Sequence, residues 1–365
     1  MESNTPKKVI IGMSGGVDSS TTAALLKKEG HFVIGVFLIF WSEKGNKTIS
    51  KTNKCCPAES LMQARKVSQI LDIPFYTVNC TTEFKKAVVD YFISEYKAGR
   101  TPNPCVVCNE EIKFKIMLEK AKKLGCNYVA TGHYARIKSK VVNKKRVCNL
   151  LKAKDKDKDQ SYFLYRLKQR ELKHILFPIG DYTKEEVRSL AKKFSLPIFD
   201  KEESQGICFV REKRHNEFLK RYLKEKEGNV IAQKGEILGK HSGLWKYTIG
   251  QREGIGISFG KPLYVISKNL KKNELIVTSD PLDSKLYPKK LIAKKVNWVS
   301  GIPKKFPLKT MAKIRYKHPA EKAEILKEKE KYIVRFEKPQ RAVTSGQSVV
   351  FYKKDRVLGG GIITQ

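Results

Sequence analysis

The sequence predicts an α/β domain with a doubly wound parallel sheet, followed by a smaller and mostly β part. Strands alternate with helices over the first two hundred residues, at the spacing of βαβ units. The pattern changes near residue 213, and six short strands of alternating apolar and polar residues fill the stretch from Tyr287 to the end. Such strands indicate a small barrel or sandwich. We therefore expect domains at 1–212, 213–285 and 286–365.

The expected first domain contains four strands separated by helices. Pro57 opens the second helix, as proline often does at the first helical position, and Gly30 follows the first helix. Ligands of such sheets bind beyond the carboxyl ends of the strands. The predicted strands are Lys8–Met13, His31–Trp41, Pro74–Asn79 and Asn127–Gly132, and the predicted helices are Ser19–Glu29, Pro57–Asp72, Glu83–Ala98 and Glu110–Leu124.

The remaining part begins with a charged helix and a glycine-rich region. We expect the helix at Lys213–Glu227, and Gly228–Ser279 holds short apolar runs between its glycines. The six strands after it are expected at Leu291–Val299, Lys309–Tyr316, Glu321–Lys327, Tyr332–Phe336, Ser348–Tyr352 and Val357–Thr364.

Positive charge dominates the composition and indicates a polyanionic partner. The 365 residues carry a formal net charge of +37. Residues 121–170 hold 15 basic and 3 acidic residues, and residues 281–320 hold 11 and 1. Two such stretches favour nucleic acid over a small acidic substrate, although a lysine-rich solvated surface is the alternative. Aromatic residues among these cations could stack on bases or belong to the core: Tyr162, Phe163, Tyr165 and Trp298.

Several classes of protein are excluded by composition. The apolar and aromatic fractions, 41% and 10%, are those of a folded chain. The longest uncharged apolar stretch, Phe32 to Trp41, has the length of a strand, so no membrane span is expected. The polar start has no signal-peptide core, and we expect a cytoplasmic protein whose eight cysteines are thiols.

A glycine- and serine-rich loop at residues 12–20 follows the first strand and precedes the first helix. Gly15 and Gly16 permit positive φ and close approach to an anion, while the serine hydroxyls and the helix N-terminus supply donors. Asp18 suits a phosphate site if Mg²⁺ bridges it to the phosphates. A Walker A lysine is missing, which argues against a γ-phosphate-hydrolysing motor.

Two cysteine loops provide candidate nucleophiles. Cys108 lies just before a predicted helix, where a thiolate is stabilised, and Cys208 lies in a short predicted apolar strand. Three further cysteines, Cys80, Cys126 and Cys148, are expected in the core, and Cys55 and Cys56 could complete a zinc site with Cys105 and Cys108. His133, at the end of a predicted strand, suits a structural or a functional role equally. Lys152–Asp159 is expected to be a solvated loop.

Taken together, these motifs resemble the tRNA-specific 2-thiouridylase family, and the phosphate loop alone resembles the wider ATP pyrophosphatase superfamily. The resemblance spans nearly the whole chain. It is carried by GMSGGVDSS at 12–20, GRTPNPCVVCNEEIKF at 99–114, TGHYAR at 131–136, KDQSYFLYRL at 158–167, ESQGICFV at 203–210 and GLWKYTIGQREGIGI at 243–257. It implies an ATP pyrophosphatase domain, a linking domain and a C-terminal β-barrel, with tRNA held across all three.

The resemblance also implies roles for individual residues. Cys108 matches the family's nucleophile, and Cys208 the cysteine that receives a persulfide from a sulfur-relay protein or a cysteine desulfurase. ATP contacts are implied for Gly12, Met13, Ser14, Gly15, Gly16, Val17, Asp18, Ser19, Leu38 and Gly132. The target base is bordered by Asn103, Pro104 and Cys105, and tRNA contacts are implied for His133, Lys158, Asp159, Gln160, Arg315, Tyr316 and Gln347.

The implied reaction is the ATP-dependent 2-thiolation of the wobble uridine of tRNA by a monomeric enzyme. One departure concerns Cys105, because many relatives have aspartate there; with Cys108 and Cys208 it could hold a [4Fe–4S] cluster. Two rival interpretations are an ATP pyrophosphatase that amidates or ligates a small acid, and a non-catalytic RNA-binding protein. The first needs no paired thiols, and the second leaves the phosphate loop without a purpose.

Overall fold

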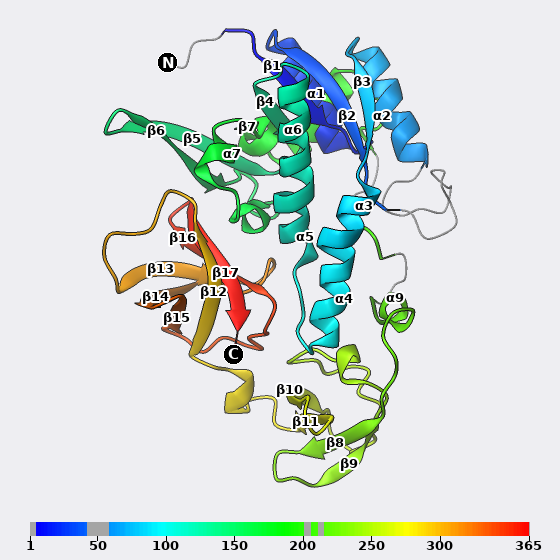
Figure 1. Cartoon of the computed structure of the whole chain (residues 1–365), viewed down its shortest axis with the longest axis vertical. Helices are drawn as coiled ribbons and strands as arrows, with labels where there is room; N and C mark the ends of the chain where they lie inside the picture. The colour runs from blue at the N-terminus through cyan, green and yellow to red at the C-terminus, as the bar shows by residue number, and fades with distance from the viewer. Residues whose placement is uncertain (1–4, 42–57, 201–205, 211–214, 365) are drawn as a thin grey trace.

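The computed structural model describes residues 5–41, 58–200, 206–210 and 215–364 (Figure 1). An α/β domain lies at one end of the long axis, a small sheet lies at the other, and a barrel lies between them on one side. Within the described ranges, no helix has the length and apolar character needed to cross a membrane.

The α/β domain is built on five parallel strands in the order β3–β2–β1–β4–β7. The predicted doubly wound sheet is confirmed, and its direction of growth reverses between β1 and β4, where such sheets bind ligands. The fifth strand was not predicted because it is only two residues long. The strands are β1 (Lys8–Gly12), β2 (Phe32–Ile39), β3 (Phe75–Asn79), β4 (Tyr128–Thr131) and β7 (Ile175–Leu176).

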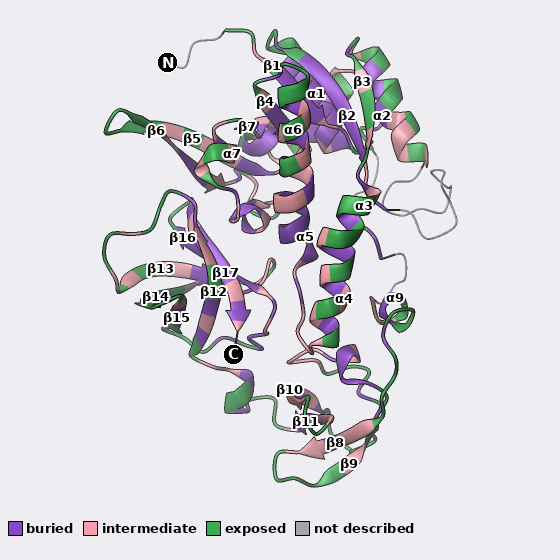
Figure 2. Ribbon diagram, viewed as in Figure 1, coloured by how far each residue is buried: buried purple, intermediate pink, exposed green. Residues whose placement is uncertain are grey.

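Alternating side chains of the central strand divide the domain into two cores. Val9 and Ile11 face one core, whereas Ile10 faces the other, and all three are fully buried (Figure 2). Helices α1 (Val17–Lys28), α2 (Ala58–Ile70) and α8 (Lys184–Lys193) contribute to the first core, and α4 (Asp90–Lys97) and α6 (Lys115–Lys123) to the second.

Two of the predicted helices contain π-helical segments. The helix expected at Glu83–Ala98 consists of α3 (Thr81–Phe84), η1 (Lys85–Val89) and α4. The helix expected at Glu110–Leu124 consists of α5 (Pro104–Val107), η2 (Cys108–Phe114) and α6. Both η1 and η2 are π-helical, a conformation that is rare and frequent at functional sites. Propensity does not distinguish this conformation from an α-helix, so the sequence predicted only helix.

An unpredicted hairpin joins the α/β domain to the barrel. Its strands, β5 (Ala135–Val142) and β6 (Lys145–Lys152), pair with each other over their full length. Arg356 of β17 pairs with Leu151 of β6, which extends the barrel sheet onto the hairpin. The segment after the hairpin is mostly short helices: η3 (Ser161–Leu164), α7 (Gln169–Leu172) and η4 (Pro178–Asp181).

The linking region contains a four-stranded sheet in the order β10–β11–β8–β9. Its helix α9 (His215–Lys220) is shorter than the predicted Lys213–Glu227, whose first two positions lie outside the described residues. The other elements are β8 (Gly228–Ala232), β9 (Ile237–His241), η5 (Leu244–Lys246), β10 (Tyr264–Asn269), β11 (Glu274–Thr278) and η6 (Ser284–Leu286).

The C-terminal part is a closed barrel of the six predicted strands. The strand order is β12–β15–β14–β13–β16–β17, and pairing of β12 with β17 closes it, which excludes the sandwich. Trp298 belongs to its core and stacks on Phe351 at 5.5 Å between ring centroids. The strands are β12 (Lys290–Trp298), β13 (Leu308–Lys313), β14 (Glu321–Glu328), β15 (Lys331–Phe336), β16 (Ser348–Lys353) and β17 (Arg356–Thr364).

Candidate active site

The loop after β1 turns sharply and is held by its own hydroxyl groups. The Ser14 backbone N–H donates to Ser19 Oγ at 3.1 Å, and Ser19 Oγ donates to the Gly16 carbonyl at 3.1 Å. Gly15 has φ +72°, and a Cβ there would overlap the carbonyl oxygen of Ser60. Gly16 has φ −104°, so the positive φ that both glycines permit is adopted by Gly15 alone of the two. Gly16 is the N-cap residue, and α1 begins at Val17 rather than Ser19.

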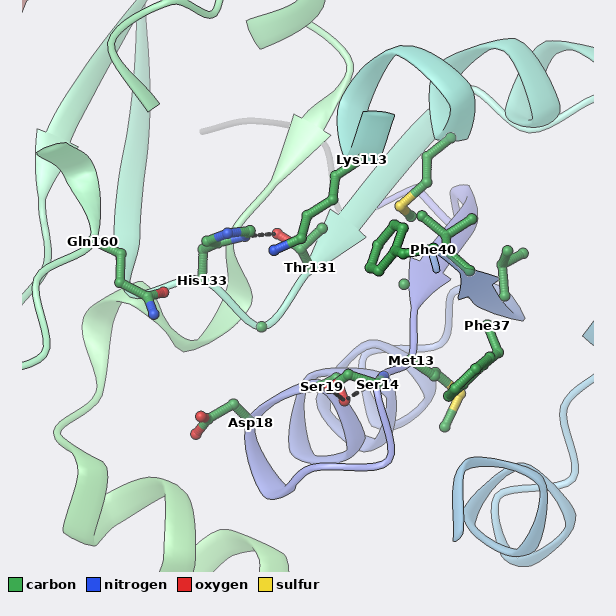
Figure 3. Close-up of a pocket in the computed structure, with 15 residues that line it drawn as sticks. Met13, Ser14, Asp18, Ser19, Phe37, Phe40, Lys113, Thr131, His133 and Gln160 are labelled. Atoms are coloured by element: carbon green, nitrogen blue, oxygen red, sulfur yellow. Dashed lines mark hydrogen bonds between the residues drawn. The ribbon is translucent and has the colours of Figure 1, made fainter. Parts of the chain in front are cut away.

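A cavity of about 210 Å³ opens at this loop, at the reversal point of the sheet (Figure 3). Seven of the ten residues with implied ATP contacts line it: Gly12, Met13, Ser14, Asp18, Ser19, Leu38 and Gly132. Gly15, Gly16 and Val17 do not line it, and Val17 is buried in the core. Gly132 allows close packing, because a Cβ there would lie 2.7 Å from the Ser19 nitrogen.

His133 and Gln160, which the resemblance assigns to tRNA, also line this cavity. Thr131 Oγ1 and His133 Nδ1 are hydrogen-bonded at 2.7 Å. Burial, and secondarily the charge of Lys113, holds the pKa of His133 well below its usual value, so the imidazole is neutral at pH 7. Gln160 Oε1 accepts a hydrogen bond from the backbone N–H of Tyr134 at 3.1 Å.

Six further residues line the cavity without having been predicted: Val36, Phe37, Phe40, Lys113, Met117 and Thr131. Val36 and Phe37 lie in β2, Phe40 follows that strand and Thr131 ends β4, and the rule that ligands bind at the carboxyl ends of strands could have found these four. Lys113 was not foreseeable in this way, because it comes from the π-helical segment η2.

Among the described residues that line the cavity, Asp18 is the one carboxylate, and it is paired with a cation. Its Oδ1 accepts hydrogen bonds from Lys184 Nζ at 2.7 Å and from the Tyr134 hydroxyl at 2.8 Å. Mg²⁺ bound with nucleotide commonly uses one or two carboxylates, phosphate oxygens and water. The single carboxylate beside the hydroxyls of Ser14 and Ser19 fits that donor set.

The two cysteine loops converge, although about a hundred residues separate them. Val106 and Cys108 belong to the same extended hydrophobic core as Phe209 and Val210, and Cys208 lies close enough to act electrostatically on Cys105 and Cys108. Phe209 lies edge-on to Phe84 and Phe92 at centroid distances of 5.7 and 5.3 Å. Cys208 is exposed, whereas Cys108 is 6% exposed. Within the described residues 206–210, Cys208 and Phe209 lie in a turn and no strand is present, so the predicted strand around Cys208 is wrong.

The environment of Cys108 differs from the sequence-based expectation. Asn103 caps α5, its side chain accepting from the Val106 N–H at 3.4 Å, and Cys108 continues this helix. Burial raises the pKa of Cys108 far above its usual value and that of Cys105 to about 11. Desolvation therefore outweighs the helix N-terminus, and the Cys108 thiol is neutral in the free protein.

The iron–sulfur and zinc hypotheses gain no support. Over the described ranges, no group of three or more His, Cys, Asp or Glu residues is arranged to hold a metal ion, and this includes Cys105, Cys108 and Cys208. Cys55 and Cys56 lie outside the described residues. Cys80, Cys126 and Cys148 are buried, as predicted.

The barrel docks on the loop that carries Asn103, Pro104 and Cys105. Gln347 Nε2 donates to the carbonyls of Thr101 and Pro102 at 3.0 and 3.1 Å, and the Thr101 N–H donates to the Ser345 carbonyl at 2.9 Å. The Gln347 side chain thus braces this loop. Arg315 donates to the Arg341 carbonyl, and Tyr316 packs on Phe163 with ring centroids 4.5 Å apart.

The segment at Lys152–Asp159 is more structured than a solvated loop. Asp159 is buried, and its carboxylate accepts from the N–H groups of Ala153 and Ser161 and from the Ser161 hydroxyl. The Lys158 N–H donates to Asp155 Oδ1 at 3.1 Å. Tyr162 and Tyr165 are fully buried, so they and Trp298 are core residues rather than stacking surfaces for bases.

Comparisons with known proteins cover nearly the whole chain. Three family models match: the tRNA methyl transferase HUP domain at 7–212, the tRNA methyl transferase PRC-barrel domain at 216–279, and the aminomethyltransferase β-barrel domain at 288–363. A solved 4-thiouridine synthetase–RNA complex with bound ATP aligns with a TM-score of 0.35 and 17% identity, over 59% of this chain and 50% of that chain.

Full-length relatives are named as thiouridylases rather than methyl transferases. A tRNA-specific 2-thiouridylase MnmA 1 of Caldanaerobacter subterraneus subsp. tengcongensis is 48% identical over 98% of this chain and 97% of its own length. The tRNA-specific 2-thiouridylase MnmA of Clostridioides difficile (strain 630) is 46% identical over 98% of each chain. With a phosphate loop and two converging cysteine loops in the same fold, the chain belongs to the tRNA-specific 2-thiouridylase family.

Proposed function

We propose that this chain catalyses the ATP-dependent 2-thiolation of the wobble uridine of tRNA. The observation that carries the proposal is the position of η2, which contributes Cys108 to the cysteine loops and Lys113 to the cavity at the phosphate loop. An enzyme that amidates or ligates a small acid would need the cavity but not the cysteine loops. A non-catalytic RNA-binding protein would need neither the cavity nor the cysteine loops.

In the first step, the 2-carbonyl oxygen of the uridine attacks the α-phosphate of ATP. A C–O–P bond forms, the bond between the α-phosphate and its bridging oxygen breaks, and pyrophosphate leaves. Loop donors such as the Ser14 and Ser19 hydroxyls bind the departing phosphates. Mg²⁺ held by Asp18 and the phosphates would supply neutralising charge. The neutral imidazole of His133 offers a hydrogen bond without adding a cation.

In the second step, sulfur replaces the adenylated oxygen. Cys208 carries a persulfide, Cys–S–SH, and its exposure allows a donor protein to load it. The Cys108 thiolate attacks the inner sulfur, a Cys108–Cys208 disulfide forms, and hydrogen sulfide ion is released. This ion attacks C2 and AMP leaves with the former carbonyl oxygen. Alternatively, the outer sulfur attacks C2 first and Cys108 then cleaves the S–S bond. In both routes a dithiol reductant, oxidised in turn, restores the thiols.

The RNA is proposed to lie across domains 1–212, 213–285 and 286–365. Asn103, Pro104 and Cys105 border the target base. The remaining proposed tRNA contacts are His133, Lys158, Asp159, Gln160, Arg315, Tyr316 and Gln347. Since Asp159 is buried and Gln347 holds the 101–102 loop, these two would act by shaping the binding surface. The proposal includes a cytoplasmic monomer that receives sulfur from a relay protein or a cysteine desulfurase.

The test incubates the protein with ATP, Mg²⁺, a persulfide donor and unmodified tRNA, and then measures 2-thiouridine by nucleoside mass spectrometry. We expect Cys108→Ser and Cys208→Ser each to lose thiolation while binding tRNA as the wild type does. Cys126→Ser, which also removes a buried thiol, is the matched control and should retain activity. Turnover in both loop variants, or no thiouridine from the wild type, would refute the proposal.

A further inference from the structure

Lys113 lies in the π-helical segment η2, five residues after Cys108. In an α-helix, residues five apart point in directions about 140° apart. The wider i→i+5 turns of a π-helix bring such residues closer to one side. The π-helical segment therefore allows one short stretch of chain to serve both the cysteine loops and the nucleotide cavity.

The side chain of Lys113 lines the cavity opposite the phosphate loop. In Figure 3 its amino group points toward Thr131 and the ring of His133, while Ser14 and Ser19 lie on the other side. Lys113 is half-buried, and in the part of the chain that the structure describes it has no carboxylate at ion-pair distance. The one carboxylate in the cavity lining, Asp18, is paired with Lys184. An unpaired ammonium in a partly enclosed cavity is suited to an anionic ligand.

The same ammonium is within electrostatic reach of the thiols. Its charge opposes the effect of burial on the pKa values of Cys105 and Cys108. In the described part of the chain, the other titratable groups that act on Cys108 are Cys208, Cys105 and Cys80, and each raises its pKa. Lys113 is the one cation among these groups.

We propose that Lys113 is a catalytic residue shared by the two half-reactions: its ammonium binds the α-phosphate of the nucleotide and stabilises the thiolate of Cys108. This inference rests on the proposed function for the identity of the phosphate. Lys113 keeps its proton in both steps and acts only through its charge. Because one ammonium serves both sites, the Cys108 thiolate is stabilised beside the phosphate of the adenylated base. The attack of Cys108 on the persulfide is thereby linked to adenylation of the uridine.

The test compares Lys113→Met, which keeps the length and removes the charge, with Lys113→Arg, which keeps the charge. Lys115→Met on the same helix is the control, since Lys115 is exposed and pairs with Glu111 at 3.1 Å. The first readout is the rate at which iodoacetamide alkylates Cys108 between pH 7 and pH 10, measured by peptide mass spectrometry. We expect about tenfold slower alkylation at pH 8 in Lys113→Met, a profile displaced to higher pH, and partial rescue in Lys113→Arg.

The second readout is tRNA-dependent release of pyrophosphate, which should fall about 100-fold in Lys113→Met. An unchanged alkylation profile would overturn the thiol role, and pyrophosphate release within twofold of wild type would overturn the phosphate role. If Lys113→Met does not fold, Lys113→Gln takes its place, and the same alkylation and pyrophosphate measurements test the two roles. Alkylation needs no tRNA, so a displaced profile in a protein that makes no thiouridine would refute the proposed function and leave the thiol role standing.

Discussion

Lys184 Nζ lies 2.7 Å from Asp18 Oδ1, which ties the start of α8 to the phosphate loop across 166 residues. Lys184 is 8% exposed, and the Tyr134 hydroxyl donates to the same oxygen. Because this pairing fixes the carboxylate that is proposed to hold Mg²⁺ with the phosphates, it is the contact whose loss should affect ATP most directly.

Replacing Lys184 with Met should raise the KM for ATP about tenfold. The Asp18 carboxylate, which is proposed to hold Mg²⁺ with the phosphates, would keep only the Tyr134 hydroxyl to fix its position, and losing a partner of a partly buried polar group costs about 1–3 kcal/mol. The measurement is pyrophosphate release against ATP concentration. Lys193→Met at the exposed end of α8 is the control, and equal KM values in the two variants would contradict the prediction.

Gly15→Ala should disrupt the phosphate loop, whereas Gly16→Ala should be tolerated. Gly15 needs φ +72° and has no room for a Cβ beside Ser60, while a Cβ on Gly16 would meet only Ser14 Oγ at 3.5 Å. A left-handed alanine costs roughly 1–2 kcal/mol before any clash, and an N-cap Gly-to-Ala change about 1 kcal/mol or less. Thermal unfolding should show a clearly lower Tm for Gly15→Ala, and equal losses would argue against this geometry.

The stability of the protein should depend on pH through His133. Its folded pKa is lowered by burial and by Lys113, so below pH 6.5 the unfolded chain binds a proton that the folded chain does not. The contribution of His133 to the free energy of unfolding is therefore fully present above the pKa of the unfolded chain. It is lost as the pH falls toward the pKa of the folded protein. His133→Gln should reduce this slope by up to about 1.4 kcal/mol per pH unit.

Urea unfolding at pH 5.0, 6.0 and 7.5 measures the effect of His133→Gln. His215, His241 and His318 have lowered pKa values too, so some dependence should persist in the variant. Parallel curves for the variant and the wild type would show that His133 does not contribute.

Arg341→Ala should weaken tRNA binding and its dependence on salt. Burial and the nearby charge of Arg341 lower the pKa of Arg315, and within the described chain neither guanidinium has a carboxylate ion pair. Two close cations without a counter-ion suit an RNA phosphate. Loss of one phosphate contact should reduce the slope of log K against log salt by about 0.7–0.9. Filter binding from 50 to 300 mM KCl tests this against Lys327→Ala, an exposed barrel lysine whose slope should change less.

The sequence determined the local parts of this protein. Alternating strand and helix patterns predicted the parallel sheet, six short amphipathic strands predicted the barrel, and the Gly12–Ser20 motif predicted a phosphate loop, because each depends on neighbours a few residues apart. Core positions for Cys80, Cys126 and Cys148 followed in the same way. The resemblance of its motifs to a known family identified the chain's relatives, and the full-length comparisons agree.

Only the tertiary structure decided how these parts meet. Three relationships join residues about a hundred to about 250 positions apart: the electrostatic contact of Cys208 with Cys108, the brace from Gln347 to the 101–102 loop, and the pairing of Lys184 with Asp18. Burial likewise reversed the thiolate expected at Cys108, since desolvation depends on what packs around a group and not on its helix position. The structure likewise shows that Cys108 and Lys113 share a π-helical segment, which helix propensity does not distinguish from an α-helix.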